Sequence, residues 1–359
     1  MDFDHVHFYV HDAQQCRDWF LRVLGFQHLD TATTASEHIE LLQAGQIVCA
    51  FSSPLSSTSP VATYLRSHPP GVFDLAFRVQ DAQSALVRAE HQGAVIVRPL
   101  TIEQQGSSTM KWGKVKGWGS LQHTLVERWG PVSALPLEQN QATVQWQAEP
   151  LGKRSDLFTH IDHAVLNVSE NELRTAVNWY QQVFGLETRR YFDIQTHRSG
   201  LRSEVLTHPQ GQVKFPINEP TSANSQIQEF LDINRGSGIQ HIALGTANIV
   251  ETVAQLRARG LSLLDIPQSY YQQLRDQFEQ QYSHLDWPAI ERQNILVDFE
   301  GKSGSGILLQ TFTQPIFQQP TFFFEMIERQ RQAQGFGQRN FLALFQAMER
   351  EQLKRSVLS

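Results

Sequence analysis

An acidic residue at the end of an aromatic run is the most unusual chemical feature of the sequence. The segment from Thr321 to Arg329 reads Thr-Phe-Phe-Phe-Glu-Met-Ile-Glu-Arg, which is typical of a buried strand, yet Glu325 stands where another bulky side chain is expected. Burial of a carboxylate is costly unless the group is paired, hydrogen-bonded or bound to a metal. Glu325 therefore requires a partner elsewhere in the chain.

Two histidines in the same half of the chain are the best candidates for that partner. His163 and His241 each lie on the first predicted strand of a repeated unit, so both are expected to point into one sheet-lined cavity with Glu325. Two imidazoles and one carboxylate on one face of an ion leave positions open, as in non-haem Fe(II) oxygenases. Zinc more often takes three ligands and one water at a tetrahedral site, and it supplies no redox chemistry. We therefore expect Fe(II).

The other histidines have a simpler interpretation, because a lone histidine on a strand is usually a core or surface residue. We apply it to four of them, which are His160, His197, His208 and His284. The first half of the chain has His5 but carries Asp74 where the second histidine would stand, and its last strand, 121–127, is not followed by a Phe-rich segment ending in Glu. We expect no iron there.

An internal duplication underlies these equivalences. Asp4-His5 matches Asp162-His163, and a glycine ends the following helical segment in both places, at Gly25 and Gly185. Within the halves, residues 71–76 resemble residues 238–243, and each of these stretches precedes another helix. Four modules result, each a strand, a helix and further strands, and the duplication is the economical explanation.

The fold class follows from these modules. Each is expected to form a βαβββ unit, and paired units form a curved, mostly antiparallel sheet around a cleft, in an α+β protein. We expect an N-terminal domain over residues 1–135, a linker over 136–157 and a C-terminal catalytic domain over 158–359. Helices are expected over three ranges, 13–24, 82–91 and 173–184, and a surface loop over 52–60.

A last amphipathic helix is expected over residues 340–354. Phe341, Leu344, Phe345 and Met348 recur at helical spacing, with 349–351 on the charged side. Because this segment follows the Glu325 strand after a glycine-flanked break, we expect it to close over the cavity as a lid.

Composition excludes several classes of partner. The chain has 359 residues, of which 40% are apolar and 18% charged, and a net charge of -6. That charge gives no basic field for nucleic acid or for a membrane surface. No signal peptide and no run of eighteen apolar residues is apparent, so a cytoplasmic location is expected. Cys16 and Cys49 are read as free thiols, and the sequence leaves open whether the protein is a homo-oligomer.

A family resemblance rests on many ordered stretches in the second half. They are Ile161-Asp162-His163, Leu201-Arg202-Ser203, 215–220, 225–230, 238–244, 295–298, 308–313, Phe323-Phe324-Glu325 and 334–337. In this order they resemble the 4-hydroxyphenylpyruvate dioxygenases, a two-domain family of the vicinal oxygen chelate superfamily. The N-terminal half resembles that family only in its module pattern.

The resemblance implies roles for particular residues. The iron ligands would be His163, His241 and Glu325, and the polar residues of the catalytic site would be Ser203, Asn218, Gln226, Gln240 and Gln310. The substrate-binding residues would be Phe312, Phe323, Phe336, Asn340 and Phe341. One departure is Gln338-Arg339, where the family usually has small residues.

The resemblance also implies an activity. The substrates would be 4-hydroxyphenylpyruvate and O2, and the products homogentisate and CO2, formed by oxidative decarboxylation, ring hydroxylation and side-chain migration. The substrate carries its own 2-oxo acid, so no second 2-oxo acid is required. Homogentisate could feed tyrosine catabolism or prenylquinone biosynthesis, and the sequence does not decide between them.

Alternatives remain at this point. A hydroxymandelate synthase would use the same substrate and metal but hydroxylate the side-chain carbon; Phe312 and Asn340 follow the dioxygenase pattern instead. An isomerase or extradiol dioxygenase on the same modules would not account for 216–220 and 334–337. A non-catalytic protein that binds small ligands is disfavoured by the complete His-His-Glu set.

Overall fold

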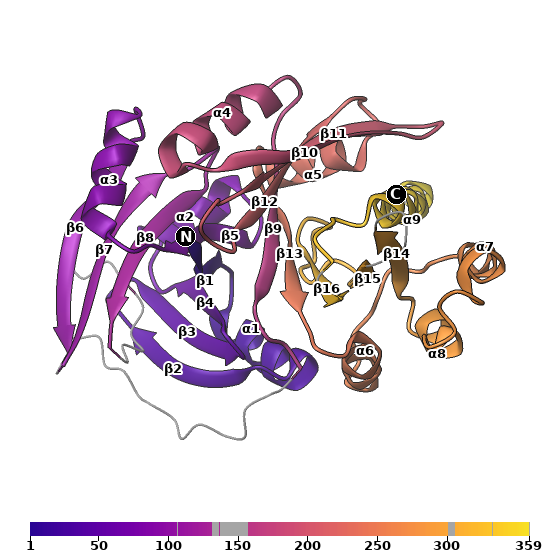
Figure 1. Cartoon of the computed structure of the whole chain (residues 1–359). Coiled ribbons are helices and arrows are strands. Elements are labelled where there is room, and N and C mark those ends of the chain that lie inside the picture. Colours follow the sequence, from indigo (N-terminus) through magenta and orange to yellow (C-terminus); the bar gives the residue numbers. More distant parts are fainter. Residues whose placement is uncertain (106, 131–135, 137–156, 301–305, 332, 359) are drawn as a thin grey trace.

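The computed structural model describes residues 1–105, 107–130, 136, 157–300, 306–331 and 333–358. Apart from its two ends, the linker predicted over 136–157 lies outside the described residues. The described residues form two eight-stranded sheets, one in each half of the chain, with helices around them (Figure 1).

The N-terminal sheet has the strand order β2-β3-β4-β1-β5-β8-β7-β6. Its strands are β1 (Asp2–Tyr9), β2 (Gln27–Thr33), β3 (Glu37–Ala44), β4 (Ile47–Pro54), β5 (Gly71–Arg78), β6 (Ile96–Gln105), β7 (Ser108–Lys116) and β8 (Gln122–Trp129). The two central strands, β1 and β5, are antiparallel, and each pairs in parallel with its outer neighbour.

The C-terminal sheet repeats this order as β10-β11-β12-β9-β13-β16-β15-β14. Its strands are β9 (Ile161–Asn167), β10 (Glu187–Gln195), β11 (Gly200–Thr207), β12 (Lys214–Pro220), β13 (Gly238–Gly245), β14 (Leu296–Glu300), β15 (Gly306–Phe312) and β16 (Phe323–Gln330). The parallel and antiparallel pairs also fall in the same places. The predicted duplication and the βαβββ modules are confirmed.

Helices connect and cover these strands. They are α1 (Ala13–Trp19), which continues into a π-helical turn η1 (Phe20–Leu24), α2 (Pro60–Ser67), α3 (Ala82–His91), α4 (Leu173–Phe184), α5 (Gln226–Asn234), α6 (Ile249–Ala258), α7 (Gln268–Phe278), α8 (Trp287–Arg292) and α9 (Gln338–Leu358). Side chains of Asp12, Asp81 and Asn248 cap α1, α3 and α6 at their first turns. None of the helices in the described part of the chain has the length and apolar character needed to span a bilayer.

The predicted surface loop over 52–60 is wrong in part. Strand β4 runs to Pro54, and α2 begins at Pro60. Ser52 is fully buried because its hydroxyl hydrogen-bonds the His7 ring at 2.7 Å on the neighbouring strand. Ser52 is therefore not a surface residue, and its hydroxyl is hydrogen-bonded within the sheet.

Other elements had no usable signal in the sequence. Strand β10 is mostly exposed, and its residues show little alternation of apolar and polar side chains. Helix α9 is longer than the predicted 340–354, and Glu349, expected on its solvent side, is only 7% exposed. Its carboxylate accepts hydrogen bonds from Thr196 at 2.8 Å and from Ser199, in the β10–β11 turn.

The two sheets share one hydrophobic core, in which aromatic residues of β16 and its approach are central. Phe322 packs edge-to-face on Phe8, with ring centroids 5.2 Å apart, and Phe324 packs on Phe20 at 5.8 Å. Successive strand residues point to opposite faces, so Phe323 and Glu325 are directed away from this core, into the C-terminal half. One face of the aromatic run, with Phe322 and Phe324, therefore packs against the N-terminal half. The opposite face, with Phe323 and Glu325, points into the C-terminal half.

We predict that Phe324→Ala destabilises the protein strongly because it leaves a cavity in the shared core. The expected loss is about 3–5 kcal/mol in the free energy of unfolding, measured by urea denaturation. Leu55→Ala is the control, since Leu55 is 55% exposed, and it should change stability by less than about 0.5 kcal/mol. Equal effects of the two substitutions would contradict this account of the core.

Candidate metal centre

Three adjacent strands bring the predicted metal ligands together. On β13, Ala243 pairs with His163 of β9 on one side and with Glu325 of β16 on the other. His241 lies two residues before Ala243, so its side chain is on the same face. The strand register therefore places all three ligand side chains on one face of the C-terminal sheet.

The three side chains form one buried cluster. His163 Nε2 lies 3.2 Å and His241 Nε2 3.7 Å from the same oxygen of Glu325, Oε2. One ligand atom from each residue lies within 4.8 Å of the others, and each residue is at most 5% exposed. No lysine or arginine of the described chain forms an ion pair with Glu325. Its negative charge is therefore available to a bound cation.

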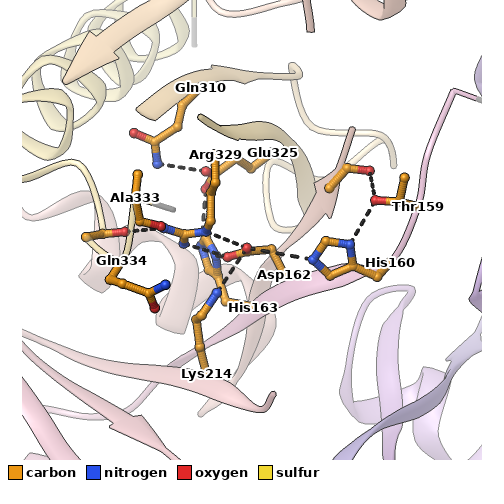
Figure 2. A network of polar contacts seen from close by, with 12 residues as sticks. Thr159, His160, Asp162, His163, Lys214, Gln310, Glu325, Arg329, Ala333 and Gln334 are labelled. Atoms are coloured by element: carbon orange, nitrogen blue, oxygen red, sulfur yellow. Dashed lines mark hydrogen bonds and ion pairs between the residues drawn. The ribbon is translucent and has the colours of Figure 1, made fainter. Parts of the chain in front are cut away.

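Asp162 orients the His163 ring through a hydrogen bond to its Nδ1. A β-bulge makes Asp162 an extra residue in β9, so its side chain turns towards its neighbour, and Asp162 Oδ1 lies 2.9 Å from His163 Nδ1. Arg329 donates two hydrogen bonds to Asp162, at 2.6 and 2.7 Å, and Lys214 donates one at 3.1 Å (Figure 2). With Nδ1 held by Asp162, Nε2 presents its lone pair towards the cluster.

Asp162 and His241 are held in the states that a metal site needs, whereas the charge beside His163 favours a proton on its ring, which a bound metal would replace. Burial acts to raise the pKa of Asp162, but hydrogen bonds from Arg329 and His163 outweigh it and hold the pKa well below its usual range. Burial also lowers the pKa of His241 strongly, which keeps its ring neutral. Burial works against protonation of His163 too, but the nearby Glu325 charge raises its pKa. The same negative field attracts a metal cation.

A second bulge aims Gln240 at the cluster. Gln240 is the extra residue of β13 opposite β9, where strict alternation would turn it away from His241. Its Oε1 lies 3.3 Å from His241 Nδ1, so each histidine is held by the residue that precedes it.

The remaining oxygen of Glu325 is held by an amide. Gln310 Nε2, from β15, donates to Glu325 Oε1 at 2.8 Å (Figure 2). Asn340 Nδ2, from α9, donates to Gln310 Oε1 at 2.8 Å. Gln310 was predicted as a polar residue of the catalytic site, and Asn340 as a substrate-binding residue. In this structure both lead to the carboxylate ligand.

Aromatic rings close the cluster on two sides. Phe323 stacks on the His241 ring at 4.7 Å between centroids, and Phe336 meets the His163 ring at 5.7 Å. Phe312 packs on Phe323 at 6.3 Å. The fourth predicted aromatic residue, Phe341, lies farther out, where it stacks on Phe192.

Polar residues of β9, β11, β12 and α5 have buried atoms that lack a hydrogen-bond partner among the described residues. Ser203 of β11 faces Asn218 of β12 across the pair, and Asn218 donates to Asn167 of β9 at 3.3 Å. Ser203 Oγ, Asn218 Oδ1, Asn167 Nδ2 and Gln226 Oε1 are buried and have no hydrogen-bond partner among the described residues. Buried polar atoms in native proteins nearly always have a partner. These four unpartnered atoms are therefore candidates for hydrogen bonds to a polar ligand.

Three functional residues of this site were not predicted from the sequence, namely Asp162, Lys214 and Arg329. A signal for the first was present, because an Asp-His pair occurs at both 4–5 and 162–163. No signal was available for Lys214 or Arg329, whose contacts with Asp162 depend on strand pairing over 52 and 167 residues.

The N-terminal sheet has the same framework without the metal ligands. Asp4 hydrogen-bonds His5 at 2.7 Å and takes two bonds from Arg128, as Asp162 does with His163 and Arg329. Asp74 stands at the His241 position, and strand pairing places Thr124 at the Glu325 position and Lys114 at the Phe312 position.

Lys114 supplies a cation to this second framework. Its ammonium lies 3.1 Å from Asp74 Oδ2, and both side chains are buried. Burial acts to raise the pKa of Asp74, but the Lys114 charge outweighs it and lowers the pKa to about 2. The negative charge of the N-terminal framework is thus neutralised by the chain itself.

The donor set fits a divalent transition metal. Two neutral imidazoles and one carboxylate suit Fe(II) as well as other ions of the first row, and a facial arrangement of three ligands leaves positions for small molecules. His163 Nδ1 hydrogen-bonds the Asp162 carboxylate, which accepts, and the Gln310 amide donates to Glu325; contacts of this kind orient ligands in metal sites.

Comparison with known proteins agrees with this geometry. A family model for the N-terminal part of hydroxyphenylpyruvate dioxygenase matches residues 1–136, and the glyoxalase, bleomycin resistance protein and dioxygenase superfamily model matches residues 160–291. An uncharacterized protein of Synechocystis sp. is 39% identical over 352 residues, which cover 97% of each chain. A 4-hydroxyphenylpyruvate dioxygenase of Caenorhabditis briggsae is 37% identical and covers 99% of this chain and 93% of its own.

A solved structure matches along almost the whole chain. A mutant of 4-hydroxymandelate synthase from Streptomyces coelicolor superposes with a TM-score of 0.86 at 27% identity, over 98% of both chains. Together with the paired βαβββ modules and the buried His-His-Glu cluster, these matches define a protein of the vicinal oxygen chelate superfamily. Within it, the chain belongs to the 4-hydroxyphenylpyruvate dioxygenase family.

We predict that Asp162→Asn weakens metal binding by about 10- to 100-fold, because the His163 ring loses the charge that orients it. The matched control is Asp4→Asn, which alters the same Asp-His-Arg unit in the N-terminal sheet. Both variants should lose about 1–3 kcal/mol of stability, but only the first should lose metal affinity in an anaerobic titration with Fe(II). A similar loss of affinity in both would argue against a specific role of Asp162.

Proposed function

We propose that the protein is an Fe(II)-dependent dioxygenase that converts 4-hydroxyphenylpyruvate and O2 to homogentisate and CO2. The observation that carries the proposal is the buried cluster of His163, His241 and Glu325 in a chain of the 4-hydroxyphenylpyruvate dioxygenase family. When bound, Fe(II) supplies the redox capacity that couples reduction of O2 to decarboxylation of a 2-oxo acid. The three ligand residues hold it, and the rest of the site binds and orients the organic substrate.

The uncommitted polar atoms are suited to the oxygen atoms of this substrate. Ser203 and the Asn218 and Gln226 amides are neutral, so they can hydrogen-bond a carboxylate, keto group or phenol without adding charge beside the metal. Their burial makes these bonds selective, because a ligand that lacks the matching groups leaves them unpaired.

The aromatic residues complement the ring of the substrate. Phe323 and Phe336 lie against the two ligand histidines, and Phe312 extends the same apolar wall. Such a wall binds an aromatic ring by burial of apolar surface and excludes water from the reacting atoms. These roles rest on the position of the rings beside the cluster.

We propose that helix α9 acts as a lid. It lies beside β14 and α5 at the C-terminal sheet (Figure 1). Phe345 anchors it in a buried cluster with Leu201, Ile227, Phe230 and Leu231. The docked helix makes the polar contacts of Asn340 and shields the site from solvent, and its opening would break them.

Hydroxymandelate formation is the second candidate, because the S. coelicolor protein shares this fold at a TM-score of 0.86. Both reactions would use the same metal site, so the product must distinguish them. We favour homogentisate on the curated relatives that match along the whole chain at 32–37% identity.

The setting of the reaction is proposed on composition. A net charge of -6 provides no basic surface for nucleic acid or anionic lipid, so we propose that its substrate is a small molecule.

We predict that anaerobic addition of Fe(II) and 4-hydroxyphenylpyruvate gives a visible charge-transfer band, and that exposure to O2 then yields homogentisate. Glu325→Ala should weaken metal binding by more than about 100-fold and abolish the band, since a ligand contributes more than the residues that orient it. His5→Ala, in the N-terminal framework, should retain both. Hydroxymandelate as the product would overturn the ring-attack assignment, and absence of the band in the parent protein would overturn the function.

We predict that Phe345→Ala lowers turnover by up to about 100-fold, because loss of the anchor lets α9 shift and misplaces groups at the site. Leu342→Ala is the control on the same helix, since Leu342 is 40% exposed, and it should leave turnover unchanged. The measurement is kcat together with protease sensitivity of α9. Full activity in Phe345→Ala with a loosened α9 would exclude the lid.

A further inference from the structure

A line of hydrogen bonds runs from helix α7 to the carboxylate ligand. Tyr270 Oη lies 3.1 Å from Asn340 Oδ1 on α9, Asn340 Nδ2 donates to Gln310 Oε1 at 2.8 Å, and Gln310 Nε2 donates to Glu325 Oε1 at 2.8 Å. The line connects two helices and two strands that are far apart in the sequence. It ends on the oxygen of Glu325 that does not face the histidines.

Each hydrogen bond in this chain of contacts can have only one donor and one acceptor assignment. An ionised carboxylate only accepts hydrogen bonds, so Gln310 must present its amide NH2 to Glu325 and its oxygen to Asn340. Asn340 must then present its NH2 to Gln310 and its own oxygen to Tyr270. The tyrosine must therefore be the donor at the far end.

The backbone of Val297 prepares Tyr270 for this role. The Val297 N–H donates to Tyr270 Oη at 2.9 Å, which uses the hydroxyl as an acceptor. The hydroxyl proton can then be donated to Asn340 at 3.1 Å or to the Val297 carbonyl at 3.3 Å. Asn340 is only 1% exposed, so its amide oxygen needs a donor within the protein, and the Tyr270 hydroxyl provides one.

Close packing restricts rotation of the Gln310 and Asn340 side-chain amides. Gly337 precedes Asn340 with a φ of +68°, and a Cβ on it would stand 2.2 Å from Gln310 Oε1 and 3.2 Å from Asn340 Cβ. Glycine therefore lets the start of α9 sit directly on the two amides. The orientation of both depends on α9 being docked.

We propose that Tyr270 is a positioning residue which, through Asn340 and Gln310, fixes the orientation of the Glu325 carboxylate and makes metal affinity depend on docking of α9. The proposal rests on the proposed function only in taking Glu325 as a metal ligand. It adds a residue that lies outside the His163–His241–Glu325 cluster, and it connects helix α9 to the metal site by hydrogen bonds.

The adjacent tyrosine provides a matched control. Tyr271 lies on the same helix and is 2% exposed, and its hydroxyl has no hydrogen-bond partner among the described residues. Tyr271→Phe thus removes one hydroxyl oxygen from α7, as Tyr270→Phe does, without breaking the hydrogen bonds that lead to Glu325.

The first test is the affinity of each variant for Co(II), titrated anaerobically without substrate, together with the cobalt absorption spectrum. We expect Tyr270→Phe to bind Co(II) about 10- to 100-fold more weakly, with a shifted spectrum, and Tyr271→Phe to stay within about threefold of the parent protein. Asn340→Ala should show the same loss as Tyr270→Phe. Unchanged affinity in Tyr270→Phe, or equal losses in both tyrosine variants, would overturn the proposal. A parent protein that binds no metal would instead refute the proposed function.

The second test separates the line from the Val297 contacts, which Tyr270→Phe also removes. If Tyr270 acts through Asn340, adding Tyr270→Phe to Asn340→Ala should weaken Co(II) binding no further. If the two losses add in full, Tyr270 acts through α7 packing alone and the proposal fails. Thermal unfolding of each variant without metal, followed by circular dichroism, verifies that folded proteins are compared.

Discussion

The structure depends on how one carboxylate is kept inside an apolar sheet. Glu325 is 2% exposed on a strand of aromatic residues, where an unpaired charge would cost several kcal/mol. Two imidazoles face one of its oxygens and an amide holds the other, while the cationic groups nearby are committed to Asp162. The metal that we propose to bind here would supply the remaining counter-charge. Strand order, bulges and the packing of the last helix all serve this arrangement.

Two irregularities of the central strands are as important as the regular pairing. In a regular ladder, Asp162 and Gln240 would face away from the histidines beside them. The bulges turn both inward, so each histidine ring has a partner on Nδ1 and its Nε2 faces Glu325. A corresponding bulge at Asp4 shows that this arrangement belongs to both halves, whereas the His-His-Glu cluster is found in the C-terminal half of the described chain.

Much of this architecture could be predicted from the sequence, because repeats and periodicity are local signals. The duplication, the βαβββ modules and the candidate ligands follow from the Asp-His pairs and from Glu325 in its aromatic setting. Exposed strand β10 and buried Ser52 could not be predicted, since their environment depends on other strands. For the same reason Arg329, Lys214 and Tyr270 carried no signal: each is defined by a contact between segments that only the folded chain brings together.

The buried Lys114–Asp74 pair gives the two halves different relations to their surroundings. The N-terminal sheet carries its balancing cation on the polypeptide, so its charge is neutralised as soon as the strands assemble. The C-terminal sheet has no such Lys or Arg partner for Glu325 among the described residues, so the metal that we propose there has to come from outside the chain. The proposed dependence on metal supply therefore concerns one half of a symmetric framework only.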